Sequence, residues 1–73
     1  MDAKQYIDEY GAEKAEEIAL ASGTNLAYFR QIASGHRNCG KTLAKRLCEH
    51  ACELDLMSLI YAKEARERRE AAG

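Results

Sequence analysis

The chain has 73 residues, which is enough for one small domain but leaves little room for an enzyme's substrate cleft beside the core. Ala is abundant, Val, Pro and Trp are absent, and 32% of the residues are charged at a net charge of −1; this composition favours an all-α fold over a β-sheet or a disordered chain. No apolar run approaches the 18 residues of a membrane span, and the first residues lack the pattern of a signal peptide, so we expect a cytoplasmic protein.

The N-terminal third predicts two short helices joined at a glycine. Asp2 followed three residues later by Gln5 matches a capping box, which predicts a helix over about 3–10. Gly11 suits the C-terminal end of that helix, and a second helix is predicted over about 12–22. The positions expected to be buried in the second helix are Ala15, Ile18 and Ala19, with Ser22 as a further candidate.

The middle of the chain predicts a third helix, a loop and a fourth helix. Gly23 interrupts the second helix, and Asn25 is a favoured N-cap residue, so the third helix is expected over about 26–34. Residues 35–40 form a loop that begins and ends with glycine. The fourth helix is expected over about 41–52.

The C-terminal part predicts a fifth helix, over about 56–69, which Asp55 can cap. Its first two turns are apolar over more than one face, so a second side of the helix must be buried. The residues expected to pair there with a second copy of the chain are Leu56, Met57, Ile60 and Tyr61. The alternative is that the core of the domain wraps around them. Residues 1–73 thus form a single domain with its core over about 3–61, and residues 62–73 are a charged helix end or tail.

The small net charge conceals a strong asymmetry along the chain. Residues 1–23 carry a net charge of −4, residues 24–46 carry +5, and residues 47–73 carry −2. No Asp or Glu occurs from Ile18 to Cys48. A segment without carboxylates can approach a polyanion such as DNA without repulsion. Chance clustering of the charges is the alternative explanation.

The spacing of small and apolar residues around Gly23 is that of a helix-turn-helix. Ala19 is small enough to let the third helix cross close over the second, and Gly23 can adopt the positive φ angle that a sharp turn needs. Ile18, Phe29 and Ile32 would pack together and fix the crossing. In this motif the second of the two helices places its N-terminal half in the major groove of DNA.

Two strings in this region resemble the Cro/repressor (Xre-like) family of small phage and prophage regulators, which includes YdaS-like proteins. They are IALASGT over 18–24 and YFRQIASGHR over 28–37, and the resemblance extends over about 4–52. It implies a lambda-repressor-like domain that binds operator DNA as a homodimer and represses transcription in a bacterial cell or phage-infected host. Ser22 stands where a larger apolar residue is usual, and Asn38-Cys39-Gly40 replaces a frequent Pro-Ser helix start. These departures predict looser packing before the turn and a more mobile loop.

The resemblance and the motif geometry together predict two sets of DNA contacts. The residues expected to face the bases are Asn25, Leu26, Ala27, Arg30 and Gln31. Gln31 can pair bidentately with adenine, and Arg30 can pair in the same way with guanine. Leu26 or Ala27 can contact a thymine methyl group. The residues expected to contact phosphates are Lys14, Tyr28, His36, Arg37, Asn38, Lys41 and Thr42, with Lys45 and Arg46 as weaker candidates. The alternatives are that Asn25 only caps the helix and that Arg30 is only solvated.

The chemistry-bearing residues outside this region do not predict a catalytic or metal site. Cys39, Cys48 and Cys52 lack paired CxxC spacing and an evident fourth ligand, so buried, reduced thiols are expected, with a redox switch at Cys39 as the alternative. No nucleophile–base arrangement or phosphate-binding glycine loop is present, so we expect neither an enzyme nor a bound cofactor or small molecule. The rival function is an antitoxin or other protein-interaction module that uses the apolar surface of the fifth helix.

Overall fold

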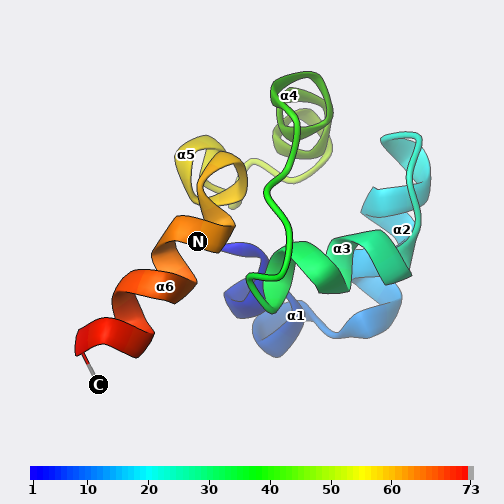
Figure 1. The fold of residues 1–73 in the computed structure, drawn as a ribbon. Helices are drawn as coiled ribbons and strands as arrows, with labels where there is room; N and C mark the ends of the chain where they lie inside the picture. Colours follow the sequence, from blue (N-terminus) through cyan, green and yellow to red (C-terminus); the bar gives the residue numbers. More distant parts are fainter. Residues whose placement is uncertain (73) are drawn as a thin grey trace.

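The computed structural model describes residues 1–72, and these fold into six helices with no β-strand among them (Figure 1). The helices are α1 (Ala3–Tyr10), α2 (Ala12–Ala21), α3 (Leu26–Ala33), α4 (Lys41–His50), α5 (Leu56–Ile60) and α6 (Ala62–Ala72). The predicted all-α class is confirmed, and the first four predicted helices agree closely with α1 to α4. The predicted single helix over 56–69 is wrong, because the chain leaves the helical conformation at Tyr61, so the five predicted helices become six.

Hydrogen bonds with the loop before α4 explain the break between α5 and α6. In a continuous helix the N–H of Lys63 would donate to the carbonyl of Leu59. Here that carbonyl accepts instead from the N–H of Cys39 at 3.0 Å, and the N–H of Lys63 donates to Oδ1 of Asn38 at 2.7 Å. Two residues of the loop thus replace one helical hydrogen bond, which is a recognised cause of helix kinks.

Side-chain caps begin α1, α3 and α5 where the sequence predicts them. Oδ1 of Asp2 accepts from the N–H of Gln5 at 2.8 Å, and Oε1 of Gln5 accepts from the N–H of Asp2 at 2.8 Å, so the predicted capping box is confirmed. Asp55 caps α5 by accepting from both the N–H and the hydroxyl of Ser58, at 3.0 and 2.7 Å. These bonds lower the pKa of the Asp55 carboxyl group, since they stabilise its charged form.

The core lies where α1, α3, α4 and α5 meet. Its largest fully buried side chains are those of Tyr6, Phe29, Ile32, Leu47 and Leu59. The rings of Tyr6 and Phe29 meet edge to face with their centroids 6.3 Å apart. α2 adds mainly small buried residues, Ala15 and Ala19 among them, which let it pack close to its neighbours.

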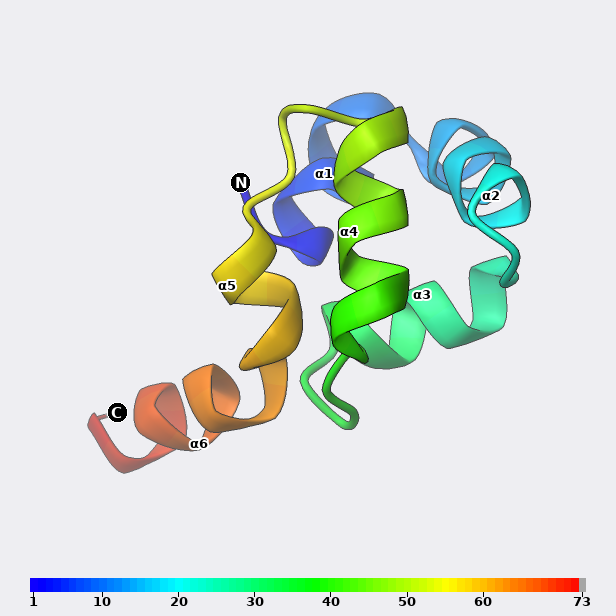
Figure 2. The ribbon, with the colours of Figure 1, turned by 90° about the horizontal axis from the view of Figure 1, so that it is seen from above.

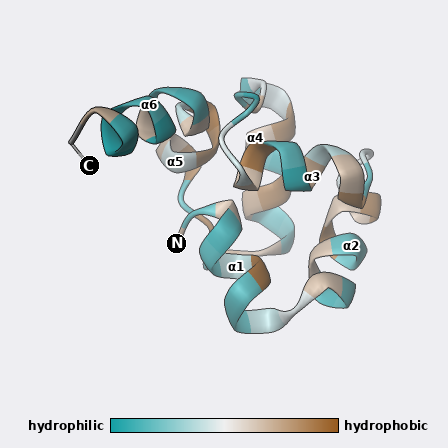
Figure 3. Cartoon of the chain, turned by 60° about the horizontal axis from the view of Figure 1, so that its bottom comes forward, coloured by the Kyte–Doolittle hydropathy of each residue, from teal (hydrophilic) through white to brown (hydrophobic). Residues whose placement is uncertain are grey.

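The views agree that α3 lies across one end of α4. α4 is seen nearly end-on in Figure 1, and it runs down the middle of Figure 2 with α3 crossing below it. α6 extends outward from the rest of the domain (Figure 2), and most of its residues are hydrophilic (Figure 3). Over residues 1–72, no helix is both long enough and apolar enough to cross a membrane.

Candidate nucleic-acid interface

A tight glycine turn joins α2 to α3. Gly23 has a φ angle of +91°, its N–H donates to the carbonyl of Leu20 at 3.1 Å, and the N–H of Thr24 donates to the carbonyl of Ala19 at 2.9 Å. This pair of bonds is the Schellman motif that ends many helices with a left-handed glycine. The prediction that Gly23 supplies a positive φ angle is therefore confirmed.

Ser22, just before the turn, is a polar residue buried at a position where an apolar residue is expected. Its side chain is only 2% exposed, and its Oγ atom has no hydrogen-bond partner within the described chain. The expected burial of Ala15, Ile18 and Ala19 is confirmed as well. A buried hydroxyl group without a hydrogen-bond partner costs stability, whereas an apolar side chain at this position would not.

α3 presents one buried and one exposed side. Phe29 and Ile32 are buried, as predicted. Asn25 caps the helix, because its Oδ1 accepts from the N–H of Tyr28 at 2.8 Å. The predicted base-facing residues Asn25, Ala27, Arg30 and Gln31 are exposed, whereas Leu26 is half-buried against the core. A partner approaching the exposed side of α3 would therefore meet mainly polar side chains.

The C-terminal end of α3 repeats the glycine turn. Gly35 has a φ angle of +78°, its N–H donates to the carbonyl of Ile32, and the N–H of His36 donates to the carbonyl of Gln31. The Oγ atom of Ser34 lies 2.6 Å from Nδ1 of His36. The chain direction directly after α3 is thus fixed by hydrogen bonds.

Two of the predicted phosphate contacts meet at the side of α3. The guanidinium carbon of Arg37 lies 5.3 Å from the centre of the half-buried Tyr28 ring, which is the distance of a cation–π contact. Arg37 and His36 remain exposed. This contact holds the Arg37 charge beside α3 while leaving it open to solvent.

Asn38 and Cys39 attach the loop to the C-terminal helices. The amide group of Asn38 donates to Oε1 of Glu64 at 3.2 Å as well as accepting from Lys63, so its side chain is engaged with α6. Cys39 is only 3% exposed, and burial raises the pKa of its thiol to about 11, with Cys48 adding to the effect. A buried thiol with so little thiolate is a poor redox sensor.

α4 begins at the end of this loop. Its N-cap residue, Gly40, has no side chain to satisfy the first N–H groups of the helix. Lys41 and Thr42, both predicted phosphate contacts, are exposed in the first turn, and that turn contains no acidic residue. The positive end of the α4 dipole is therefore open to an anion.

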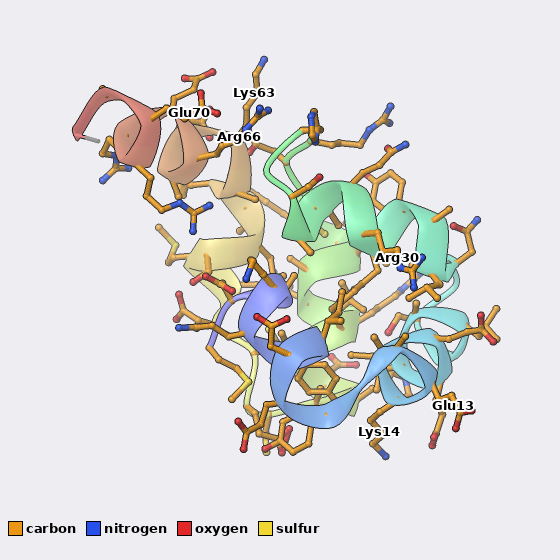
Figure 4. The ribbon with its side chains drawn as sticks, turned by 90° about the horizontal axis from the view of Figure 1, so that it is seen from below. Glu13, Lys14, Arg30, Lys63, Arg66 and Glu70 are labelled. Atoms are coloured by element: carbon orange, nitrogen blue, oxygen red, sulfur yellow. The ribbon has the colours of Figure 1, made fainter. Side chains whose placement is uncertain are left out.

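The ion pairs within residues 1–72 lie outside the acid-free segment. They join Lys4 to Asp8 at 2.9 Å, Lys14 to Glu17 at 3.6 Å and Arg66 to Glu70 at 3.0 Å. Among the predicted phosphate contacts, Lys14 is thus the one basic residue that forms an ion pair within the described chain, and Figure 4 shows it pointing outward from α2, away from α3. All basic residues of the acid-free segment lack such a partner in the described chain, namely Arg30, Arg37, Lys41, Lys45 and Arg46.

The predicted dimerisation residues divide into two pairs. Met57 and Tyr61 are 56% and 47% exposed, whereas Leu56 and Ile60 are half-buried against the core. The core of the domain therefore covers Leu56 and Ile60, as the alternative explanation expected, but it does not cover Met57 and Tyr61. The exposed pair remains available to a partner.

The cysteines differ from the expectation in one respect. Cys39 is buried and Cys48 is half-buried, but Cys52 is exposed and lies beyond α4, which ends at His50. The expectation of three buried thiols is thus wrong for Cys52. In the part of the chain that the structure describes, no three His, Cys, Asp or Glu residues are grouped so as to hold a metal ion.

Searches of known protein families, curated proteins and solved structures give no match for this chain. The candidate interface is therefore assigned from the positions of its own residues and from the family resemblance of the strings over 18–24 and 28–37.

Two more basic residues lie beside the interface; Arg46 was only a weaker candidate of the sequence analysis, and Lys63 was missed. The Nη1 atom of Arg46 lies 3.7 Å from the place a Cβ atom would take on Gly23, so this side chain reaches from α4 to the turn. Lys63 lies at the start of α6, beside the loop that contains Asn38. Asn38 departs from the usual sequence of this loop, and its side chain binds α6. No local pattern of the sequence reveals that partner, which lies 25 positions away.

Proposed function

We propose that this protein is a sequence-specific DNA-binding regulator of transcription, most simply a repressor. α2, the turn at Gly23 and α3 would act as a helix-turn-helix, with α3 in the major groove. The observation that carries the proposal is the acid-free segment over 18–48, whose basic side chains have no carboxylate partner within the described chain. Unpaired cations in a segment without carboxylates favour phosphate binding, because neutralising phosphates releases counterions.

The exposed side of α3 would read the bases. Gln31 and Arg30 are both exposed and have suitable donors for adenine and guanine. Gln31 lies between Ala27 and Ser34 on this side, so it is the central candidate. Arg30 lies toward the flank opposite Tyr28, and Figure 4 shows it pointing away from the loop before α4. Asn25 would contribute mainly by capping the helix.

The flanks of this reading surface would hold the DNA backbone. Arg37, stacked on Tyr28, and His36 would contact phosphates on one side. Lys41, Thr42 and the uncapped N-terminal end of α4 would contact neighbouring phosphates on the same flank. Lys14 is a weaker candidate than these residues, because the Glu17 carboxylate beside it would repel a phosphate.

A pair of chains would match a palindromic operator. Two copies joined through Met57 and Tyr61 would place their α3 helices in major grooves about 34 Å apart. A dimer bound at a promoter would exclude polymerase, which is the basis of repression. Changing Met57 to Glu should give a monomer in size-exclusion chromatography, while a surviving dimer would place the contact elsewhere.

The first test measures binding to a random-sequence duplex at several salt concentrations. The logarithm of the binding constant should fall linearly with the logarithm of the salt concentration, with a slope of about −0.9 for each phosphate neutralised. A protein that does not bind the duplex even at low salt would contradict the proposal.

The second test separates base contacts from phosphate contacts. Operator sequences would first be selected from a random DNA pool. Gln31→Ala should then relax the preference at one base position, at a cost of about 1–3 kcal/mol, whereas Arg37→Ala should weaken binding to all sequences alike. Equal effects of the two substitutions would show that α3 is not the reading helix.

The second candidate function is a protein-interaction module, such as an antitoxin. The exposure of Met57, in the first turn of α5, and of Tyr61, the residue that ends this helix four positions later, favours it. Such a module would bind its protein partner without the steep salt dependence described above. The two functions are compatible, because the apolar pair lies outside the acid-free segment.

A further inference from the structure

The N-terminal end of α6 is capped by a residue distant in sequence. The first N–H groups of a helix have no partner within it, and the residue before α6, Tyr61, has no side-chain acceptor suited to capping. Oδ1 of Asn38 takes this role by accepting from the N–H of Lys63 at 2.7 Å. Nδ2 of Asn38 also donates to Oε1 of Glu64 at 3.2 Å, so one side chain holds two successive residues of α6.

A second contact holds the next turn of α6 to the same loop. The side chain of Arg66 lies directly over Gly35, where an added Cβ atom would be 2.5 Å from the Arg66 Cβ and 2.8 Å from its Cδ. Nε of Arg66 donates to Oε1 of Glu70 at 3.0 Å, which orients the side chain along the helix. The first two turns of α6 are therefore attached to both ends of the segment over 35–38.

These attachments place the Lys63 side chain beside the predicted phosphate contacts. Lys63 is exposed, and it forms no ion pair with another residue of the described chain. Figure 4 shows it pointing outward from α6 on the side where α3 and the loop before α4 also lie. Asn38, to which its backbone is bonded, directly follows Arg37.

We propose that Lys63 is a further phosphate-contacting residue and that Asn38 places it there as a positioning residue. The inference rests on the proposed DNA-binding function and deepens it, because it extends the basic surface from α3 and α4 onto α6. It also replaces the expected role of Asn38, whose amide is engaged with α6 rather than open to a phosphate. The ligand is the sugar–phosphate backbone, so the contact carries no base preference.

The salt dependence of binding tests the role of Lys63. Lys63→Gln should reduce the magnitude of the salt slope by about 0.9 and weaken operator and random duplex by the same factor. Arg68→Gln is the matched control: it removes the same charge from an exposed position of the same helix, about 140° around the axis from Lys63. An unchanged slope for Lys63→Gln, or an equal change for Arg68→Gln, would overturn the role of Lys63.

A double-mutant cycle tests the role of Asn38. Asn38→Ala should weaken duplex binding in the unmodified protein and should have no further effect once Lys63 is Gln, because the two residues act through one contact. Additive effects would mean that Asn38 contacts DNA by itself and would overturn its positioning role. Amide exchange gives a separate readout, since Asn38→Ala should speed exchange of the Lys63 N–H while Arg68→Gln should not.

Arg37→Ala separates failure of this inference from failure of the proposed function. If Arg37→Ala lowers the salt slope and Lys63→Gln does not, the inference is wrong and the DNA-binding function stands. If the unmodified protein shows no salt-dependent duplex binding, the proposed function is wrong, and the inference falls with it.

Discussion

The two glycine turns at the ends of α3 have the same backbone but different surroundings. Gly23 and Gly35 both adopt a positive φ angle, and both complete a Schellman pair of hydrogen bonds. A Cβ atom on Gly23 would meet only the tip of a flexible side chain at 3.7 Å, whereas one on Gly35 would collide with Arg66 at 2.5 Å. Gly23 is needed only because of its φ angle. Gly35 is needed for its φ angle and also because a side chain there would collide with α6.

The largest expected effect follows substitution of the crowded glycine. Gly35→Ala should lower the free energy of unfolding by about 3 kcal/mol, since the left-handed conformation and the overpacking against α6 act together. Urea unfolding with far-UV circular dichroism measures this loss. Gly40→Ala is the control and should change stability by at most about 0.5 kcal/mol, because Gly40 has a φ angle of −65° and open space around it.

The loop that follows Gly35 should protect its cysteine. Because burial raises the pKa of Cys39 to about 11 from an ordinary 9.0, the thiolate fraction at pH 8 is about 100-fold lower than in the unfolded chain. Alkylation at pH 8, followed by mass spectrometry, should modify the exposed Cys52 first and Cys39 only in denaturant. Fast labelling of Cys39 in the native protein would mean that the loop opens, and that the Gly35 turn is no more firmly held than the Gly23 turn.

A smaller effect is expected at the open turn. Gly23→Ala should lower the free energy of unfolding by about 1–2 kcal/mol, which is the cost of a left-handed conformation without a collision. The same urea titration applies, and Gly11→Ala should lose at least as much despite the open space around it, because its φ of +90° and ψ of 162° lie in a region essentially restricted to glycine. A loss at Gly23 as large as that at Gly35 would remove the distinction between the two turns.

The smallest effect concerns Ser22, just before the open turn. Ser22→Ala should raise the free energy of unfolding by about 0.5–1 kcal/mol, because it removes a buried hydroxyl group that lacks a partner. Thermal unfolding measures the gain. Ser34→Ala is the control at the other turn; it should not stabilise the protein, because the Ser34 hydroxyl donates to the carbonyl of Gln31 at 3.1 Å.

The local features of this protein were determined by the sequence itself. Asp2 with Gln5, Asn25 and Asp55 begin helices at the predicted positions, because a capping bond spans only three residues. The φ angle of Gly23 and the inward side of α3 were equally predictable, since each depends on neighbours within two helical turns.

Only the tertiary structure decided the features that join distant segments. The predicted helix over 56–69 broke because Asn38 and Cys39 took over one of its hydrogen bonds. Contacts with α6 also engaged Asn38, brought the backbone of Lys63 to it, and crowded Gly35 but not Gly23. Helix periodicity and capping preferences act over a few residues, whereas these contacts join residues 20 or more positions apart, so no local pattern of the sequence encodes them.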